Sequence, residues 1–575
     1  MKLKNILKYT ALAAIALTTT SCLDLEPKEQ LADPDMWAKP GDYENFANKM
    51  YDALPNFGMV FDGYIHCDKR SDIVMDKGGR NLYAFGLNTI PASDGDYTGA
   101  YTKIRRCCLL LEHAPSYANQ KDIAQYIGEA YFFRAWNYFQ LLQKFGDVII
   151  VRNTIDTDDP LLYAKRNPRG EVVDFIIEDL NNAVEYLKPT AELPEGRVGV
   201  EGAYAFLSRV ALYEGTWQKF RDNATRGHEL LDIAAKAAKT VIDGGKFQLF
   251  YNQALGDASQ KYMFILENAV CNGAGLQKDA NHEYIIKHCY DETIKPTGQQ
   301  LTIEVLNNAE YVSAKFASLY LCQNGLPIEY NGQTNPQFKG YDKLNSEWQN
   351  RDNRMRYTLM MPGEYFWNNS AANCRIDWSN SEAELNRAKI KNFVPNTGTG
   401  YFPQKWAAER QVADRNESYD YPVIRYAEVL LNYAEAVYER DGAISDDDLN
   451  ISLNLTRRRV NKNMPALSNA FVAANGLDMR EEIRRERTIE FFQEGFRIDD
   501  LKRWHTAVEE MNQDFLGIRW QGEWRTKWIQ PGYTQNADGN LVVETGRAWT
   551  ERNYLYPLPS DQLQLNPNLG QNPGW

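Results

Sequence analysis

Apolar residues recur at the spacing of an α-helix in four stretches of the N-terminal half. These stretches are residues 123–142, 172–187, 203–217 and 230–241. Each is short and has one apolar face, which it has to bury against a neighbouring helix. Helix-ending residues follow three of them: Gly146, Pro189 and Gly244. The sequence therefore predicts a mostly α-helical fold in which helices pack in pairs. The spacing is too irregular for a strict tetratricopeptide repeat of about 34 residues, but it suits stacking of that kind.

The helical period fades between about Lys246 and Asp420. Gly, Pro and Asn interrupt short runs there, and aromatic residues gather: Tyr341, Trp348, Tyr357, Tyr365, Phe366, Trp367, Trp378, Tyr401 and Trp406. Long irregular segments in a compact protein usually carry a function, so we expect a loop-rich ligand face here. Helices are predicted again at 421–440 and up to Leu501, followed by an irregular tail rich in Trp and Tyr.

The charge balance argues against one broad class of function. The formal net charge is −13 at pH 7, and no block of Lys and Arg interrupts this acidity. Because an acidic surface repels nucleic-acid phosphates, we expect no nucleic-acid partner. Hydrophobic residues make up 43% of the chain and charged residues 25%, which is typical of a globular protein and not of a disordered or polytopic membrane protein.

The first 21 residues have the pattern of a lipoprotein signal peptide. Three Lys precede the apolar stretch Ala11–Leu17, which is too short to span about 30 Å of hydrocarbon. Thr19-Thr20-Ser21 then leads to Cys22, the predicted lipidated residue, although Thr19 stands where Leu is usual. Acyl chains on Cys22 would anchor the mature chain to a membrane. The alternative is an ordinary signal peptide in which Cys22 is incidental.

No pattern of catalytic or metal-binding residues stands out. Without Cys22, seven scattered Cys remain, with no CxxC spacing, and they are interpreted as buried small side chains. His282 and His288 are six residues apart, which is the wrong spacing for a helical zinc motif. The acidic run Asp446–Asp448 suits a helix N-terminus better than a calcium loop. We expect no cofactor, although a structural calcium held by scattered oxygen ligands stays open and no metal ligand is assigned.

Several motifs, in order along the chain, resemble the SusD/RagB family of outer-membrane nutrient-binding lipoproteins. They are Cys22–Pro27, Tyr101–Leu110, Glu129–Phe139 with Phe145–Val148, Gly196–Val198, Ala211–Tyr213, Asn324–Ile328, Asn350–Asp352, Tyr421–Ala436, Glu486–Trp504, Tyr556–Pro559, Asn566–Pro567 and Gln571–Trp575. Cys108 and Ile149 depart from the residues usual in the family. Glu486, Glu490 and Glu494 lie four residues apart, where Arg could pair with them, so we interpret this motif as scaffold.

The resemblance implies a tetratricopeptide-like bundle of helix pairs that carries an irregular, loop-rich ligand face. It divides the chain into a signal peptide (1–21), an N-terminal helical part (22–245) and a C-terminal part with the ligand loops (246–575), the last two forming one compact unit. It further implies a non-enzymatic, cell-surface lipoprotein of a Bacteroidetes-type outer membrane. Such a protein captures oligosaccharide or polysaccharide and delivers it to a partner TonB-dependent transporter.

Ligand residues of such a protein cannot be transferred by motif, so our candidates are positional. The loop 77–97 offers Arg80, Tyr83, Asp96 and Tyr97, and the middle segment offers Tyr290, Trp348, Trp367 and Trp378. Aromatic rings can take the apolar faces of sugars, while polar groups bind their hydroxyls. Packing in the core is the competing role for each ring. Two other functions stay open: binding of peptides, as in the RagB branch, and glycoside hydrolysis, which needs a close pair of carboxylates.

Overall fold

The computed structural model describes residues 36–575 except 59–64, 77–79, 300, 303–309, 363–364, 369–370, 376–397, 409–414 and 528–531. The predicted signal peptide and Cys22 lie outside the described residues. For the strands at 365–368 and 371–375, only the backbone is described.

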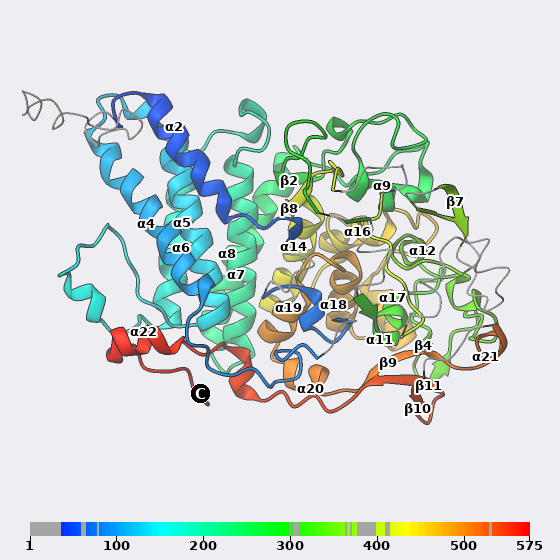
Figure 1. Ribbon diagram of the computed structural model, residues 1–575. Coiled ribbons are helices and arrows are strands. Elements are labelled where there is room, and N and C mark those ends of the chain that lie inside the picture. The colour runs from blue at the N-terminus through cyan, green and yellow to red at the C-terminus, as the bar shows by residue number, and fades with distance from the viewer. Residues whose placement is uncertain are drawn as a thin grey trace, which may run out of the picture.

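Long helices stand side by side in the N-terminal half, and one helix of the C-terminal half lies next to them (Figure 1). They are α4 (Gly95–His113), α5 (Ala124–Phe145), α6 (Arg169–Tyr186), α7 (Val200–Lys219), α8 (Ala224–Gly244) and α14 (Tyr426–Asp441). α4 packs on α5, α5 on α6, and α7 on α8, while α14 packs on α7 and α8. The four predicted amphipathic stretches are α5 to α8, so the helix-pair fold is confirmed.

Shorter helices and small sheets make up the remainder. The shorter helices are α2 (Pro40–Asn48), α9 (Ser259–Ile265), α11 (Ala314–Leu319), α12 (Asn353–Thr358), α15 (Asp446–Asn450), α16 (Leu453–Arg458), α17 (Asn469–Asn475), α18 (Met479–Glu490), α19 (Arg497–Arg503), α20 (Ala507–Met511), α21 (Glu523–Lys527) and α22 (Ser560–Leu565). One 3-10 turn, η3 (Asp68–Arg70), bears on the site described below. Ser445 caps α15, so the acidic run 446–448 does begin a helix.

The sheets are all antiparallel, with two or three strands each in the described part of the chain. The pairs are β1 (Val74–Asp76) with β3 (Glu310–Val312), β2 (Tyr284–His288) with β8 (Tyr421–Arg425), β4 (Glu329–Tyr330) with β5 (Gln333–Thr334), β6 (Tyr365–Asn368) with β7 (Ala371–Arg375), and β11 (Asn540–Glu544) with both β9 (Phe515–Arg519) and β10 (Thr534–Gln535). The helix predicted from residue 421 is therefore wrong over its first five residues. They form β8, because β2 supplies a hydrogen-bonded partner, and α14 begins only at Tyr426.

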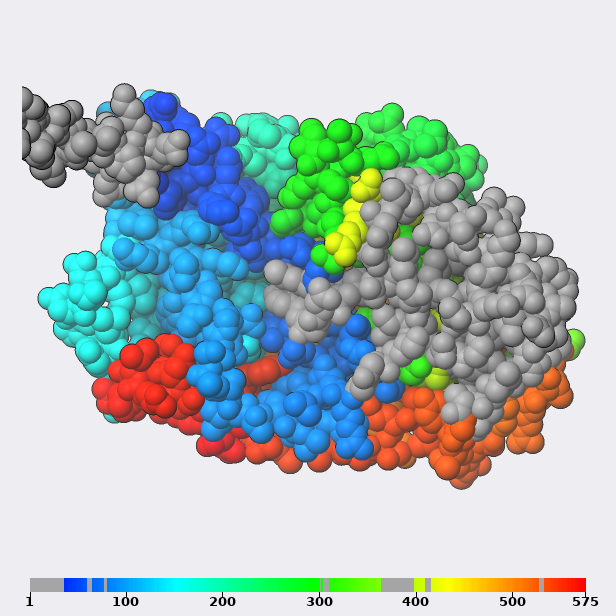
Figure 2. All heavy atoms as spheres, viewed as in Figure 1, coloured from blue at the N-terminus to red at the C-terminus, as the bar shows by residue number. Residues whose placement is uncertain are grey.

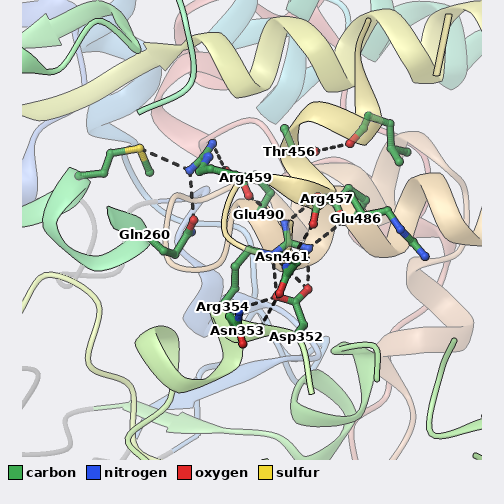
Figure 3. A network of polar contacts seen from close by, with 12 residues as sticks. Gln260, Asp352, Asn353, Arg354, Thr456, Arg457, Arg459, Asn461, Glu486 and Glu490 are labelled. Atoms are coloured by element: carbon green, nitrogen blue, oxygen red, sulfur yellow. Dashed lines mark hydrogen bonds and ion pairs between the residues drawn. The ribbon is translucent and has the colours of Figure 1, made fainter. Parts of the chain in front are cut away.

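A network of buried ion pairs holds the C-terminal half together (Figure 3). Arg354 of α12 pairs with Asp352, Glu486 and Glu490 over N–O distances of 2.6 to 3.0 Å. Glu486 and Glu490 lie on α18, as the sequence pattern predicted. Glu494 lies beyond the end of that helix, yet it joins the network through Arg425.

Glu490 is the centre of this network because three arginines share it. Its carboxylate oxygens lie 3.0 Å from Arg354, 2.7 Å from Arg425 and 2.8 Å from Arg459. Burial by itself acts to raise the pKa of Glu490, but the three guanidinium groups outweigh it and lower that pKa to about 2. The arginines come from α12, from β8 and from the end of α16, so a single carboxylate ties three segments to α18.

A cavity of about 90 Å³ lies between the helical half and the C-terminal half. Three of the side chains that line it have a buried polar atom without a hydrogen-bond partner among the described residues: Trp136 Nε1, Asp68 Oδ1 and Gln493 Oε1. Asp68 Oδ1 and Gln493 Oε1 are acceptors that lack a donor. A proton on the Asp68 carboxyl group turns it into a donor. Burial raises the pKa of Asp68 to about 7, which places this proton in the neutral pH range.

The described cysteines agree with their predicted role. The described structure has no disulfide bond at Cys67, Cys107, Cys108, Cys271, Cys289 or Cys322, and all except the half-buried Cys289 are buried. Cys374 falls in the part where only the backbone is described. None of the helices in the described part of the chain combines the length and apolarity needed to cross a lipid bilayer.

Replacing the central carboxylate tests the network. We expect Glu490→Gln to lower the free energy of unfolding by about 3–5 kcal/mol, since it removes one buried negative charge that three guanidinium groups share. The control is Glu178→Gln, which breaks the exposed bidentate pair with Arg152 and is expected to cost about 1 kcal/mol or less. Urea unfolding followed by Trp fluorescence measures both. Equal losses would show that the buried network contributes no more than a surface pair.

The pH dependence of stability tests the proton on Asp68. Its pKa is raised in the folded state, so the unfolded chain loses this proton first as the pH rises. The folded state is then progressively penalised between about pH 4 and 7, by up to about 4 kcal/mol. We expect Asp68→Asn, which keeps a donor at that position, to unfold at higher urea concentration than the natural chain at pH 8 but not at pH 4. The exposed Asp538→Asn is the matched control, and a difference that does not change with pH contradicts the assignment.

Candidate functional site

An open hollow of about 680 Å³ lies beside the N-terminal end of α4. One side is built from η3 and from residues 81–96, and the other from the end of α5 and from Tyr556 and Pro557. In Figure 2 the light-blue surface that contains residues 80–96 lies directly beside the red C-terminal segment. Segments from the two ends of the chain therefore form one concave surface, with Arg70, Asp94, Asp96 and Lys144 as its charged groups.

Lys144 binds two carboxylates on one side of the hollow. Its Nζ atom lies 2.7 Å from Asp94 Oδ2 and 2.7 Å from Asp96 Oδ2. Asp94 is also the N-cap of α4, where its Oδ1 accepts the backbone N–H groups of Asp96 and Tyr97. Partial burial acts to raise the pKa of Asp96, but the Lys144 ammonium outweighs it and lowers that pKa. Asp96 is therefore ionised at neutral pH, and Lys144 holds both carboxylates in place.

Two stacked tyrosines form the opposite wall. The rings of Tyr83 and Tyr556 lie 4.5 Å apart at an interplanar angle of 11°. Arg70 Nη1 donates a hydrogen bond to Tyr556 Oη, and the Arg70 guanidinium lies 5.6 Å from the centre of the Tyr83 ring. The Tyr556 backbone N–H donates to Lys144 O over 2.8 Å, which fixes this wall to the end of α5.

The loop that borders the hollow exposes aliphatic side chains. Leu82 is 59% exposed, Leu87 45% and Ile90 44%. Between them, Asn88 accepts a hydrogen bond from Asn553 Nδ2 through its Oδ1 atom, over 3.0 Å. The Asn88 Nδ2 atom has no partner among the described residues. We name this surface, Leu82 with Leu87 and Ile90, the aliphatic lip.

Two of the predicted ligand residues, Tyr83 and Asp96, line the hollow. Asp96 is exposed, whereas Tyr83 is only 4% exposed and has its hydroxyl bonded to Asn553 O over 3.1 Å. Its ring supports the wall and is not a free stacking surface. Arg80 is exposed nearby, with its guanidinium 4.9 Å from the Phe85 ring. Tyr97 is buried in α4 with its edge against Phe145.

The other predicted residues lie away from the hollow or outside the description. Tyr290 is half-buried, with its ring 5.7 Å from that of Phe57. Trp348 is 7% exposed, and its indole N–H donates to Leu359 O over 3.3 Å, so it is a core residue. Nothing is described of the side chain of Trp367, and Trp378 lies outside the described residues.

Sequence reasoning missed Arg70, Lys144 and Tyr556 as members of the site. The Tyr556 motif was interpreted only as a typical family ending, and Lys144 follows the helical stripe that was interpreted as scaffold. The sequence does show polar and aromatic residues close to helix ends: Lys144 precedes Gly146, and Asp94 precedes α4. This clustering could have indicated that a site lies near helix ends. That signal does not say which helix ends meet.

One group of potential metal ligands occurs in the described part of the chain, away from the hollow. Ligand atoms of Glu195, Cys289 and Asp420 all lie within 4.8 Å of one another. The Asp420 carboxylate, however, is bonded to the ammonium groups of Lys278 at 2.7 Å and Lys287 at 2.9 Å. These lysines supply the positive charge that a metal would bring, so the group does not fit a metal site.

Comparison with known protein families decides the class of this chain. The SusD family model matches residues 265–575. The chain belongs to the SusD family. A second family model, described as starch-binding associating with outer membrane, matches residues 89–212, which include the end of the loop and the helices α4 and α5 beside the hollow.

Relatives and solved structures of the SusD family cover most or all of the chain. A SusD-like protein of Bacteroides ovatus is 21% identical over 100% of this chain and 98% of its own. SusD-like protein P2 of Formosa agariphila is 24% identical over 78% of this chain and 73% of its own. A SusD-like carbohydrate binding protein from Bacteroides fragilis has the same fold, with a TM-score of 0.72, 21% identity, and coverage of 93% of this chain and 100% of that one.

One further structure of this fold is a complex with a xylogluco-oligosaccharide. It has a TM-score of 0.63 and 17% identity, and the match covers 92% of this chain and 98% of that one. The predicted tetratricopeptide-like fold of a SusD-family chain is thereby confirmed.

The contacts of Lys144 in this SusD-family protein are open to direct measurement. We expect Lys144→Met to lower the free energy of unfolding by about 1–3 kcal/mol, because it leaves the Asp94 and Asp96 carboxylates facing each other without a cation. The matched change Asp96→Asn removes one exposed partner and is expected to cost about 0.5 kcal/mol. Urea unfolding of the two variants measures the difference. An equal loss in both contradicts a buried role for Lys144.

Proposed function

We propose that this SusD-family protein binds glycans in the hollow between residues 70–96 and Tyr556. The observation that carries the proposal is the convergence of Arg70, Lys144 and Asp96 on one concave surface of about 680 Å³. Charged donors and acceptors of this kind suit the hydroxyl groups of sugars. Support also comes from the family, which includes a carbohydrate binding protein and a complex with an oligosaccharide.

The proposed mechanism involves capture without catalysis. Glycoside hydrolysis requires one protonated and one ionised carboxyl group. The close carboxylate pair of the hollow, Asp94 and Asp96, is bound on one ammonium group, and the pKa of Asp96 is lowered. Asp96 is therefore not suited to donate a proton to a leaving oxygen at neutral pH, and Asp94 is already bonded to Lys144 and to two backbone N–H groups. The hollow is open and polar, so binding is expected to be weak and reversible.

We further propose that the chain acts at the outer membrane, anchored by lipid on Cys22, and delivers the captured glycan to a partner TonB-dependent transporter. The description of the matching family model as associating with outer membrane supports this location. Tethering two partners to one membrane raises the effective concentration of the ligand at the transporter, so low affinity is sufficient. Tight binding would only slow the release of the glycan.

Peptide binding is the second candidate, and the aliphatic lip favours it. Leu82, Leu87 and Ile90 offer the kind of surface that apolar peptide side chains contact. An oligopeptide library and a glycan panel, offered to the same protein, distinguish the two functions.

Affinity electrophoresis and calorimetry with a panel of neutral polysaccharides test the glycan proposal. We expect one or a few polymers to retard the chain. We also expect Arg70→Met to weaken binding by about 10- to 100-fold, the effect of losing a charged hydrogen bond. The control is Arg152→Met, which removes an exposed guanidinium from a different surface. Absence of retardation across the panel, or equal effects of the two variants, contradicts the proposed site.

A further inference from the structure

A second groove, of about 530 Å³, lies along α4 and shares no lining residue with the hollow. Its walls are residues 97–105 of α4, the segment 149–163 and the C-terminal residues 562–569. In Figure 2 the cyan surface of the middle segment lies beside the red C-terminal surface. Tyr101 Oη donates to Ile149 O over 2.9 Å, and Asn566 Nδ2 donates to Ala164 O over 2.8 Å. Hydrogen bonds between the walls therefore hold the groove in shape without a ligand.

The lining of this groove is mostly apolar. Aliphatic and aromatic residues outnumber polar ones in it. Several of the apolar side chains are in contact with solvent: Leu565 is 69% exposed, Tyr163 59% and Leu162 37%. A preformed, mostly apolar groove of this volume is typical of a site for a small ligand. Covering these exposed side chains would favour binding.

Most polar side chains of the lining are already hydrogen-bonded within the protein. All three threonines donate their hydroxyl hydrogens to protein oxygens, over 2.8 to 3.2 Å. The hydroxyls of Tyr97 and Tyr101 share a hydrogen bond, and Asn566 uses both its Nδ2 and its Oδ1 atom. The lining side chains whose polar ends have no partner among the described residues are Arg105, Asn153, Gln562 and Tyr163.

This inventory decides between classes of ligand. A peptide brings one N–H and one C=O group per residue into a groove, and a glycan brings several hydroxyl groups per ring. Few donors in the lining remain to bond such groups, and a polar group buried without a partner weakens binding. An acyl chain has no polar group along its length, so it suits the lining best.

Arg105 is the one charged side chain that lines the groove in the described part of the chain. It is exposed, and it forms no ion pair or hydrogen bond with any described residue. No described carboxylate lines the groove, although the whole chain has a net charge of −13. A guanidinium group binds a carboxylate through two parallel hydrogen bonds. The ligand that matches this groove is therefore an apolar chain with one anionic end.

We propose that the groove binds a free long-chain fatty acid. Its acyl chain lies against the aliphatic side chains between α4 and α22, and its carboxylate pairs with Arg105. The lining runs along α4 from Tyr97 to Arg105, which is about 12 Å at a rise of about 1.5 Å per residue. This site does not depend on the proposed glycan-binding function, since the two sites have no lining residue in common.

Displacement of a fluorescent fatty acid, cis-parinaric acid, from the full chain tests the proposal. All ligands are kept below their critical micelle concentrations. We expect laurate to displace the probe and butyrate not to, because each methylene group that leaves water tightens binding by up to about fourfold. Dodecanol, which has the same chain length but no charge, is expected to bind about tenfold more weakly than laurate, the effect of losing a charged hydrogen bond.

Two variants separate the charge from the apolar surface. Arg105→Met is expected to weaken laurate binding by about tenfold and to leave dodecanol binding unchanged. Leu565→Ser is expected to weaken the binding of both ligands by about threefold, because it removes apolar contact. Both side chains are exposed, so the fold does not depend on them. The controls are Arg525→Met and Ile294→Ser, which change exposed side chains that do not line the groove.

The alternative occupants give different results. Equal binding of laurate and dodecanol, or an equal loss in Arg525→Met, overturns the role of Arg105. Absence of probe binding overturns the site itself. Binding to the Cys22→Ala chain but not to the natural chain would mean that the chain's own acyl group fills the groove, which overturns a free fatty acid as the ligand. Members of an oligopeptide library that displace the probe more strongly than laurate would make it a peptide site instead. Polysaccharides are expected not to displace the probe, so glycan binding can fail without affecting this inference.

Discussion

The structure depends above all on buried ion pairs between arginines and carboxylates. An isolated buried guanidinium or carboxylate is strongly destabilising, so every member of such a network constrains the position of the others. Glu490 satisfies Arg354, Arg425 and Arg459 together, which come from three separate segments. Loops have little preference of their own for one conformation. The shared ion pairs fix how these segments are arranged, since displacing one segment would separate its charge from a buried partner.

The position of Arg70 in the hollow depends on this network. Glu494 binds Arg425 and Lys405, and the preceding residue, Gln493, donates its backbone N–H to Asp68 Oδ2 over 2.7 Å. Asp68 begins η3, and Arg70 ends it. The guanidinium that faces the hollow is thus connected to the buried ion pairs through a single turn. The site has a rigid scaffold beneath it even though loops form much of its surface.

Sequence reasoning recovered the parts of this fold that local pattern determines. The apolar period identified α5 to α8, and the motif at 486–504 was correctly interpreted as scaffold. It failed where a distant partner decides the outcome. Residues 421–425 read equally well as the start of a helix, and only pairing with β2 makes them a strand. Tyr83 and Trp348 were expected to bind ligand, yet other segments bury them. Leu82 and Leu87 attracted no notice, because an aliphatic side chain in a loop is ordinary until its neighbours are known.

The wall formed by Tyr556 has a consequence for biosynthesis. Arg70 and Tyr556, which bond to each other, lie 486 residues apart along the chain. During translation the helical half can pack long before Tyr556 leaves the ribosome, so the hollow is among the last features to form. A polypeptide released before that residue has the loop and the aliphatic lip but lacks the opposite wall. A complete hollow therefore requires a chain that extends past Tyr556.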